Sequence, residues 1–113
     1  MEVNACHRFA DIAPRKARLV ADLIRGEAVP DALDTLRLTR KRASGMVSKV
    51  VAAAAAAASE QHDLDPDELY VARAWVDEGP MRRKFWARPR GMFARKLHRT
   101  SHIHVVLCDT EDF

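Results

Sequence analysis

A basic stretch from residue 79 to residue 102 constrains the fold of this chain more than any other feature. It reads GPMRRKFWARPRGMFARKLHRTSH, and its basic residues are Arg82, Arg83, Lys84, Arg88, Arg90, Arg95, Lys96 and Arg99. Subtracting these eight from the 19 basic residues of the chain leaves 11 against 16 acidic residues, a net charge of −5. No acidic residue lies between Glu78 and Asp109. The positive charge is therefore local, and because like charges repel, a bound polyanion would stabilise the stretch.

The middle of this stretch predicts a turn and not a long helix. Pro89 and Gly91 interrupt helical geometry, and in Arg88–Gly91 they occupy the second and fourth positions of a turn, where each is well tolerated. Two strands joined there would form a β-hairpin arm over residues 80–97, extending about 30 Å at about 3.3 Å per residue. Several apolar side chains lie too close to the charges to form a separate core: Met81, Phe85, Trp86, Met92 and Phe93. We therefore expect an arm that a partner surrounds.

The remainder of the chain has the size and composition of one intracellular domain. A length of 113 residues supports a single modest core, so we expect one domain over residues 1–113. The longest apolar run, residues 50–58, is too short to span a bilayer, and the first residues do not resemble a secretory signal. Two cysteines, Cys6 and Cys108, fit a reducing cytosol better than a disulfide framework. These features predict a cytoplasmic protein without a membrane partner.

Helical patterns occupy the first half of the chain. Pro14 opens a helix that ends at Gly26, with an apolar face of Leu19, Val20, Leu23 and Ile24. A short helix over residues 30–36 follows, with Leu33 and Leu36 facing the core. Thr39 is a candidate cap for a third helix that begins in the basic run at residues 40–42 and continues to about His62. Seven alanines at residues 52–58 allow this helix to pack closely against its neighbour.

Strand patterns frame the helices. Residues 3–12, 69–77 and 102–108 alternate or concentrate apolar and β-branched residues, and the last two segments flank the basic arm directly. The order of elements predicts an α+β fold: a small three-stranded antiparallel sheet packed on three helices, with a long basic β-hairpin extension.

A second group of cations lies in the first turn of the helix that begins at Pro14. Arg15, Lys16 and Arg18 oppose the helix dipole there, which disfavours them unless an anion lies nearby. Contact with a phosphate and an ordinary solvated surface are both open interpretations of this cluster. Lys49 follows Arg42 by two helical turns, so both side chains are expected on one side of the third helix.

Metal binding and catalysis receive little support. A zinc site is conceivable among residues near the chain ends, but the paired C-x2-C spacing is missing from Cys6, His7, His102, His104 and Cys108. A nuclease would combine His98 or His102 with Asp77 or Glu78, yet no nucleotide-binding, nucleophile-elbow or metalloprotease motif accompanies them. We therefore expect no metal, no cofactor and no enzymatic activity.

Other cationic proteins provide alternatives. A membrane-active peptide needs an uninterrupted amphipathic helix, which Pro89 and Gly91 prevent. A DNA-binding protein needs a recognition helix or a symmetric dimer, and neither pattern is present. A solvated charged surface explains the basic residues but not Trp86 and the phenylalanines among them. A general cationic nucleic-acid-binding module remains the main alternative to the interpretation below.

Three separated stretches match the pattern of one known protein family. The first is APRKARLV at residues 13–20 with LIRG at residues 23–26, where Ala13 replaces the usual serine. The second is DEGP at residues 77–80, directly before the basic hairpin. The third is RTSHI at residues 99–103. The spacing between the last two matches the family without a gap, and the similarity covers nearly the whole chain. The chain thus resembles the L-twenty-two family of large-subunit ribosomal proteins.

The resemblance implies a structural protein of the large ribosomal subunit that acts in translation and ribosome assembly. Its partners would be large-subunit ribosomal RNA, neighbouring ribosomal proteins and, at the hairpin tip, the nascent peptide in the exit tunnel. The candidate RNA-binding residues are then Arg15, Lys16, Arg18, Arg25, Lys41, Lys49, Arg82, Arg83, Lys84, Arg88, Arg90, Arg95, Lys96, Arg99, Ser101 and His102. The tunnel tip would comprise Trp86, Ala87, Arg88, Pro89, Arg90, Gly91, Met92 and Phe93.

Two segments depart from the family pattern. The family commonly has "PRArGRA" at the tip, whereas this chain shifts the proline by two positions and has Met92 in place of an arginine. The third helix has alanines and Ser59 where the family often has an asparagine-containing run. Contacts made by those family residues are not transferred to this chain.

Overall fold

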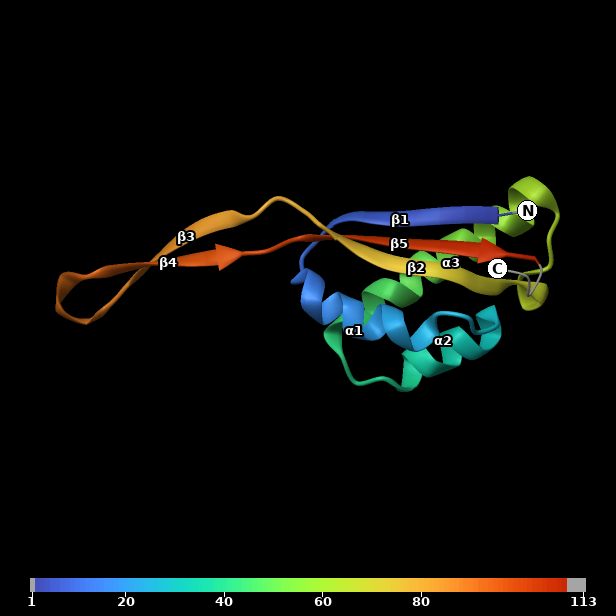
Figure 1. Ribbon diagram of the computed structural model, residues 1–113, viewed down its shortest axis with the longest axis horizontal. Helices are drawn as coiled ribbons and strands as arrows, with labels where there is room; N and C mark the ends of the chain where they lie inside the picture. The colour runs from blue at the N-terminus through green and yellow to red at the C-terminus, as the bar shows by residue number, and fades with distance from the viewer. Residues whose placement is uncertain (1, 110–113) are drawn as a thin grey trace.

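The computed structural model describes residues 2–109, with the side chains of Arg95 and Lys96 outside the described part. Within these residues the chain forms three α-helices, one three-stranded antiparallel sheet and a separate two-stranded hairpin (Figure 1). The sheet and helices make a globular base, and the hairpin projects from one end of it. The extents of 62 × 25 × 21 Å reflect this projection. The predicted α+β class, with its basic hairpin extension, is confirmed.

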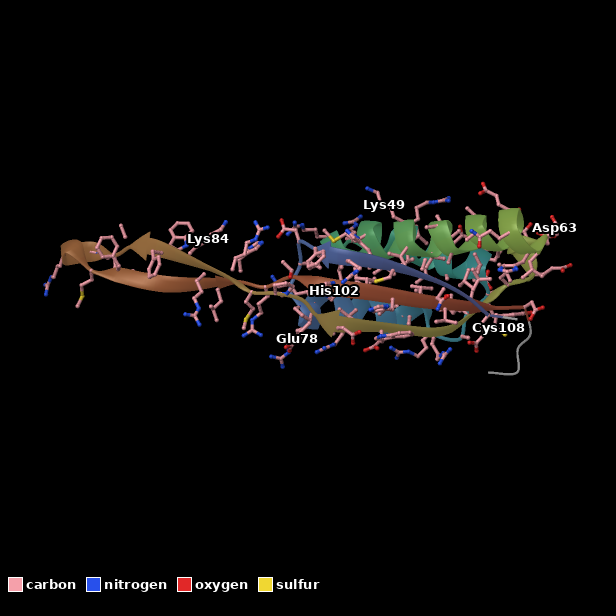
Figure 2. The ribbon with its side chains drawn as sticks, turned by 90° about the horizontal axis from the view of Figure 1, so that it is seen from above. Lys49, Asp63, Glu78, Lys84, His102 and Cys108 are labelled. Atoms are coloured by element: carbon pink, nitrogen blue, oxygen red, sulfur yellow. The ribbon has the colours of Figure 1, made fainter. Side chains whose placement is uncertain are left out.

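The base is built around a sheet in the order β1–β5–β2. Its strands are β1 (Glu2–Ala10), β2 (Tyr70–Glu78) and β5 (Ser101–Cys108). The central strand β5 is the most apolar, and Ile103, Val105 and Leu107 are fully buried. Glu2 pairs with Cys108, so the described ends of the chain lie together, at the end of the sheet opposite the arm (Figure 2).

The helices cover one face of this sheet (Figure 1). They are α1 (Pro14–Ile24), α2 (Val29–Leu38) and α3 (Arg42–His62), followed by a short 3-10 turn at Pro66–Glu68. α3 packs against β1 and β5 through its alanines, of which Ala54 and Ala58 are fully buried. The small alanine side chains allow this close approach, as the sequence predicted.

The predicted apolar face of α1 is only half correct. Val20 and Ile24 are fully buried, but Leu19 and Leu23 are 55% and 44% exposed. The buried stripe instead passes through Ala17, Val20, Ala21 and Ile24, at the spacing of one narrow helix face. Leu19 and Leu23 lie beside this stripe, on the flank of the helix, because α1 packs against the base through its alanine, valine and isoleucine side chains.

The predicted capping role of Thr39 is wrong. Its hydroxyl donates to the carbonyl of Thr35 at 2.7 Å, one turn back, and therefore terminates α2 instead of starting α3. Lys41 occupies the position before α3 and offers no capping side chain. The hydroxyl of Ser44 closes the loop by donating to the carbonyls of Thr39 and Lys41. A threonine hydroxyl within reach of a free helix-end carbonyl competes effectively with a capping role.

The arm consists of β3 (Arg82–Ala87) and β4 (Phe93–His98), paired in register from Arg82 opposite His98 to Ala87 opposite Phe93. The turn lies where it was predicted. The backbone N–H of Arg88 donates to the carbonyl of Met92, and Pro89–Gly91 forms a single 3-10 turn between them. Arg90 and Gly91 both have positive φ, 65° and 74°. Gly91 accommodates this left-handed geometry without strain.

The junction between base and arm is tight. The backbone N–H of Gly79 donates to the carbonyl of Thr100 at 2.9 Å, and the Thr100 hydroxyl donates to the carbonyl of Pro80 at 2.7 Å. A Cβ atom at Gly79 would overlap the Thr100 hydroxyl and lie 3.2 Å from the Thr100 carbonyl carbon. The arm is thus a continuation of β2 and β5 through a closely packed crossing point.

Candidate nucleic-acid interface

Cations and aromatic rings are mixed on both faces of the arm. All six residues of β3 are exposed, and because side chains alternate along a strand, Arg82, Lys84 and Trp86 share one face while Arg83 and Phe85 share the other. Phe93 across the hairpin is 76% exposed. Arginines with exposed rings on the same face can bind phosphates and stack on bases. The arm therefore presents a candidate nucleic-acid interface on two sides.

The tip of the arm is exposed throughout. Arg88, Pro89, Arg90, Gly91 and Met92 form the connecting loop, and Trp86, Ala87 and Phe93 lie at the ends of the strands that lead into it. The side chains of Arg95 and Lys96 were also predicted to bind RNA, but they lie outside the described residues.

Two adjoining grooves lie where the arm meets the base, and we call them together the shoulder. The first groove has a volume of about 600 Å³ and the second about 640 Å³. They share Ala13, Lys16, Leu19 and Arg99. The first is further lined by residues of the α3 start and of β4, and the second by Arg15, Arg18 and Glu78. The structure thus brings the predicted cations Arg15, Lys16, Lys41 and Arg99 together at the base of the arm.

The N-termini of α1 and α3 both open onto the shoulder. Ala13 and Lys41 occupy the N-cap positions of these helices, and neither side chain accepts a capping hydrogen bond. The first turn of neither helix contains an acidic residue. The partial positive charge of a helix N-terminus favours an anion, and so do the basic side chains in these turns. This geometry favours phosphate contact over the solvated alternative for Arg15 and Lys16.

One acidic residue of the shoulder is already paired. Asp11 accepts a hydrogen bond from Arg42 at 3.3 Å and lies in a short contact with His98 on the arm. The hydrogen bond with His98, helped by Arg42, holds the pKa of Asp11 below its usual range. Asp11 is therefore a carboxylate at neutral pH that ties the arm to the base while its charge is balanced locally.

Two of the predicted RNA-binding arginines bind the protein itself. Arg18 donates through Nε and Nη2 to the carbonyl of Val76, at 3.2 and 3.1 Å. Arg25 does the same to the carbonyl of Ala74, at 3.2 and 2.6 Å, and also pairs with Asp22. β2 is an edge strand, and these bonds occupy its open carbonyls. Arg18 and Arg25 therefore hold α1 against the sheet edge.

Two predicted RNA-binding residues of the RTSHI stretch, Ser101 and His102, also contact the protein itself. Ser101 is fully buried, and its hydroxyl donates to the carbonyl of Ile12 at 2.5 Å. Nδ1 of the half-buried His102 accepts from the backbone N–H of Phe9 at 3.0 Å. Phe9 has a φ of 60° at the irregularity in β1, and its ring packs edge-on against His102. Both residues therefore stabilise the β1–β5 junction next to the arm.

Lys49 is exposed on α3, farther from the arm than the shoulder (Figure 2). The sequence-based selection missed Arg42, Leu97 and Asp11, which line the shoulder. The basic run at residues 40–42 was a signal for Arg42. No local signal identified Asp11, because its contact with His98 joins residues 87 positions apart.

Within residues 2–109, the side chains considered for a metal site or for nuclease chemistry do not come together as either site would require. Cys6 Sγ lies 3.7 Å from His104 Nε2, but no group of three or more possible ligands is present in this range. His104 instead pairs with Asp77 at 3.2 Å and stacks on Trp75. His98 contacts Asp11 and not Asp77 or Glu78. In the same range, no helix has the length and apolar character needed to cross a membrane.

Comparisons with known proteins agree with the resemblance drawn from the sequence. The family model of "Ribosomal protein L22p/L17e" matches residues 5–108. Two relatives are each named "Large ribosomal subunit protein uL22", from Thermoanaerobacter sp. (strain X514) and Thermoanaerobacter pseudethanolicus (strain ATCC 33223 / 39E). Each is 47% identical over 111 residues, covering 98% of this chain and 100% of the relative. The chain therefore belongs to the family of ribosomal protein L22p/L17e.

Proposed function

We propose that this chain is a structural constituent of the large ribosomal subunit, in the cytoplasm, where it binds large-subunit ribosomal RNA and assists assembly. The observation that carries the proposal is the exposed arm, in which cations and aromatic rings are mixed in a segment that contains no acidic residue. Family membership supports the same role and a structural, non-enzymatic protein. Neighbouring ribosomal proteins are its further partners.

The binding mechanism is charge neutralisation with local stacking. Arginine guanidinium groups pair with converging phosphates in planar, multidentate geometry, and the release of counterions from RNA drives association. The exposed rings Phe85, Trp86 and Phe93 stack on unpaired bases or wedge between them. Direct contacts are assigned to exposed cations of the arm, the shoulder and α3: Arg15, Lys16, Lys41, Lys49, Arg82, Arg83, Lys84, Arg88, Arg90 and Arg99. Arg95 and Lys96, whose side chains lie outside the described part, are assigned the same role from the sequence.

Four further candidates act through the protein framework in this proposal. Arg18 and Arg25 fix α1 to the edge of β2, while Ser101 and His102 fix β5 to β1 beside the arm. Residues 1–113 work as one domain, and residues 80–97 are the arm that threads into RNA. An arm held rigidly by the base can join RNA segments that the base alone does not reach.

The finer assignment concerns the tip, Trp86–Phe93. We place it in the exit tunnel, next to the nascent peptide. Support comes from the exposure of the tip and its distance from the base (Figure 1). Crosslinking from a photoreactive residue at Met92 to a stalled nascent chain tests this assignment. Crosslinks to RNA alone would contradict the peptide contact while leaving RNA binding intact.

A salt titration of binding to large-subunit ribosomal RNA tests the main proposal. Removing two phosphate contacts in the double variant Arg88→Ala/Arg90→Ala reduces the slope of log K against log salt by about 1.4. The matched control is Arg37→Ala/Arg73→Ala, which removes the same charge from two exposed arginines of the base that are paired with Asp34 and Glu2. An equal loss in both variants would show that only net charge matters and would contradict the arm's role.

A further inference from the structure

The first groove of the shoulder combines an apolar wall with a cationic rim. Ile12, Ala13, Leu19, Ala43 and Leu97 supply the wall. Lys16, Lys41, Arg42 and Arg99 supply the rim, and Asp11 and His98 complete the lining. Its volume of about 600 Å³ falls within the range of small-molecule sites, about 300–1,000 Å³. The groove is therefore large enough for one nucleotide.

Two leucines of this wall face solvent. Leu19 and Leu97 are 55% and 46% exposed, although they come from α1 and β4, which are far apart in the sequence. Scattered exposed leucines are common, but here both line the same concave site. Their exposed surface is available to cover the face of a flat, weakly polar ligand.

The rim is arranged for an anion. Lys41 and Arg42 lie at the uncapped start of α3, and Lys16 lies in the first turn of α1, whose start is also uncapped by any described side chain. The one carboxylate in the groove, Asp11, is paired with Arg42 and His98. The positive charges of Lys16, Lys41 and Arg99 are not balanced by this paired carboxylate. The groove therefore has an excess of positive charge.

We propose that this groove takes one unpaired nucleotide of the bound RNA, with its base against Leu19 and Leu97 and its phosphate at Lys16, Lys41 and Arg99. This inference rests on the proposed RNA-binding function and adds a specific site to it. An apolar peptide would leave the rim cations without a counter-charge. A continuous duplex would hide its base faces from the leucines, since stacked bases expose only their edges in the grooves.

The second groove provides a path for the adjacent nucleotide. It shares Lys16, Leu19 and Arg99 with the first and continues along Arg15 and Arg18. Glu78 in its lining disfavours a phosphate at that side, which places the backbone nearer to Arg15. The RNA strand therefore crosses the shoulder from α3 towards the start of α1, with the unpaired base pointing into the first groove.

Methyl NMR with two matched ligands tests the proposal. The full-length protein, with labelled leucine and methionine methyl groups, is titrated with an adenosine tetranucleotide and with an abasic tetranucleotide that has the same number of phosphates. We expect the methyl signals of Leu19 and Leu97 to shift with the adenosine ligand only, and its affinity to exceed that of the abasic ligand by about tenfold.

Two leucine variants supply the matched comparison. Leu19→Ala should reduce the preference for the adenosine ligand by about threefold, since part of the base's contact surface is lost. Leu23 lies one turn further along the same helix, has a similar exposure of 44% and lines neither groove. Leu23→Ala should therefore leave the preference for the adenosine ligand unchanged. Both leucines are partly exposed, and the methyl spectra verify that each variant is folded.

Two results would overturn the proposal in distinguishable ways. If both ligands shift the methyl signal of Met92 at the tip of the arm but leave Leu19 and Leu97 unmoved, the nucleotide site is wrong and general RNA binding by the arm stands. If neither ligand shifts any signal at low salt, the RNA-binding function on which the inference rests is itself wrong.

Discussion

The base and the arm share two continuous stretches of chain, since β2 leads into β3 and β4 leads into β5, yet the two regions differ in how they are stabilised. In the base, β2 and β5 are covered on one face by helices, and Ile103, Val105 and Leu107 are fully buried. In the arm, none of the described α-helices lies beside the continuing strands β3 and β4, and every residue of β3 is exposed (Figure 1). The base can therefore stabilise itself by burial, whereas the arm requires a partner to bury its rings and neutralise its charge.

The largest expected contrast is between truncations of apolar side chains in the two regions. Ile103→Ala should lower the free energy of unfolding by about 2–5 kcal/mol, because it opens a cavity in the centre of the sheet. Phe93→Ala in the arm should change it by less than about 0.5 kcal/mol, because that ring is exposed. Urea denaturation of the isolated protein measures both. Similar losses would show that the arm contributes to the core.

The junction is expected to be the next most sensitive point. Gly79→Ala should destabilise the protein by about 1–3 kcal/mol, since its Cβ overlaps the Thr100 hydroxyl and lies close to backbone. Adding Thr100→Ala should restore part of the loss. Gly45→Ala in α3 is the matched control, because nothing lies within 4 Å of its Cβ position. It should stabilise the helix by about 0.5–1 kcal/mol, and thermal unfolding should give the two glycine variants opposite signs.

Arginines of α1 should separate stability from binding. Arg25→Ala removes two hydrogen bonds to the Ala74 carbonyl and should cost about 1 kcal/mol of folding stability. Lys16→Ala removes an exposed cation at the shoulder and should weaken RNA binding with a stability change within about 0.5 kcal/mol. Denaturation and RNA-binding measurements on both variants check this division. If Arg25→Ala and Lys16→Ala changed stability and RNA affinity by the same amounts, the separation of the two roles would be contradicted.

The smallest expected effect concerns pH. The folded-state pKa of Asp11 is lowered, chiefly by its hydrogen bond with His98, so its contribution to stability is present above the unfolded value of about 3.9. That contribution is lost as the pH falls through the lower folded-state pKa. NMR titration of the Asp11 carboxyl should therefore show a larger upward pKa change in His98→Ala than in Arg42→Ala. The reverse order would show that Arg42 is the main cause.

Local sequence signals predicted most of the architecture. Pro89 and Gly91 located the hairpin turn, and the apolar run at residues 102–108 located the central strand, because these are short-range preferences. The roles of Arg18 and Arg25 were not predictable, since their acceptors are carbonyls of an edge strand that lie 58 and 49 residues away in the sequence. The exposure of Leu19 had a similar cause: helical periodicity identifies an apolar stripe but not which part of it meets the sheet.

The shoulder illustrates the same limit. Its cations were visible as clusters at residues 15–18 and 40–42, but their convergence on the base of the arm depends on how α1 and α3 point. The pairing of Asp11 with His98 depends on the arm's crossing point as well. Sequence therefore identified the cations of the candidate interface more completely than it predicted where they converge.

Co-sedimentation with large ribosomal subunits in a high-salt gradient tests the central claim most directly, that the arm requires RNA around it. A simple reversible complex with eight phosphate contacts would have a salt slope of about −6 and would dissociate as salt increases. The full-length protein should remain on the subunit, while Arg88→Ala/Arg90→Ala should be retained less well. Complete release of the full-length protein at the same salt would contradict an embedded arm and favour a general cationic nucleic-acid-binding module.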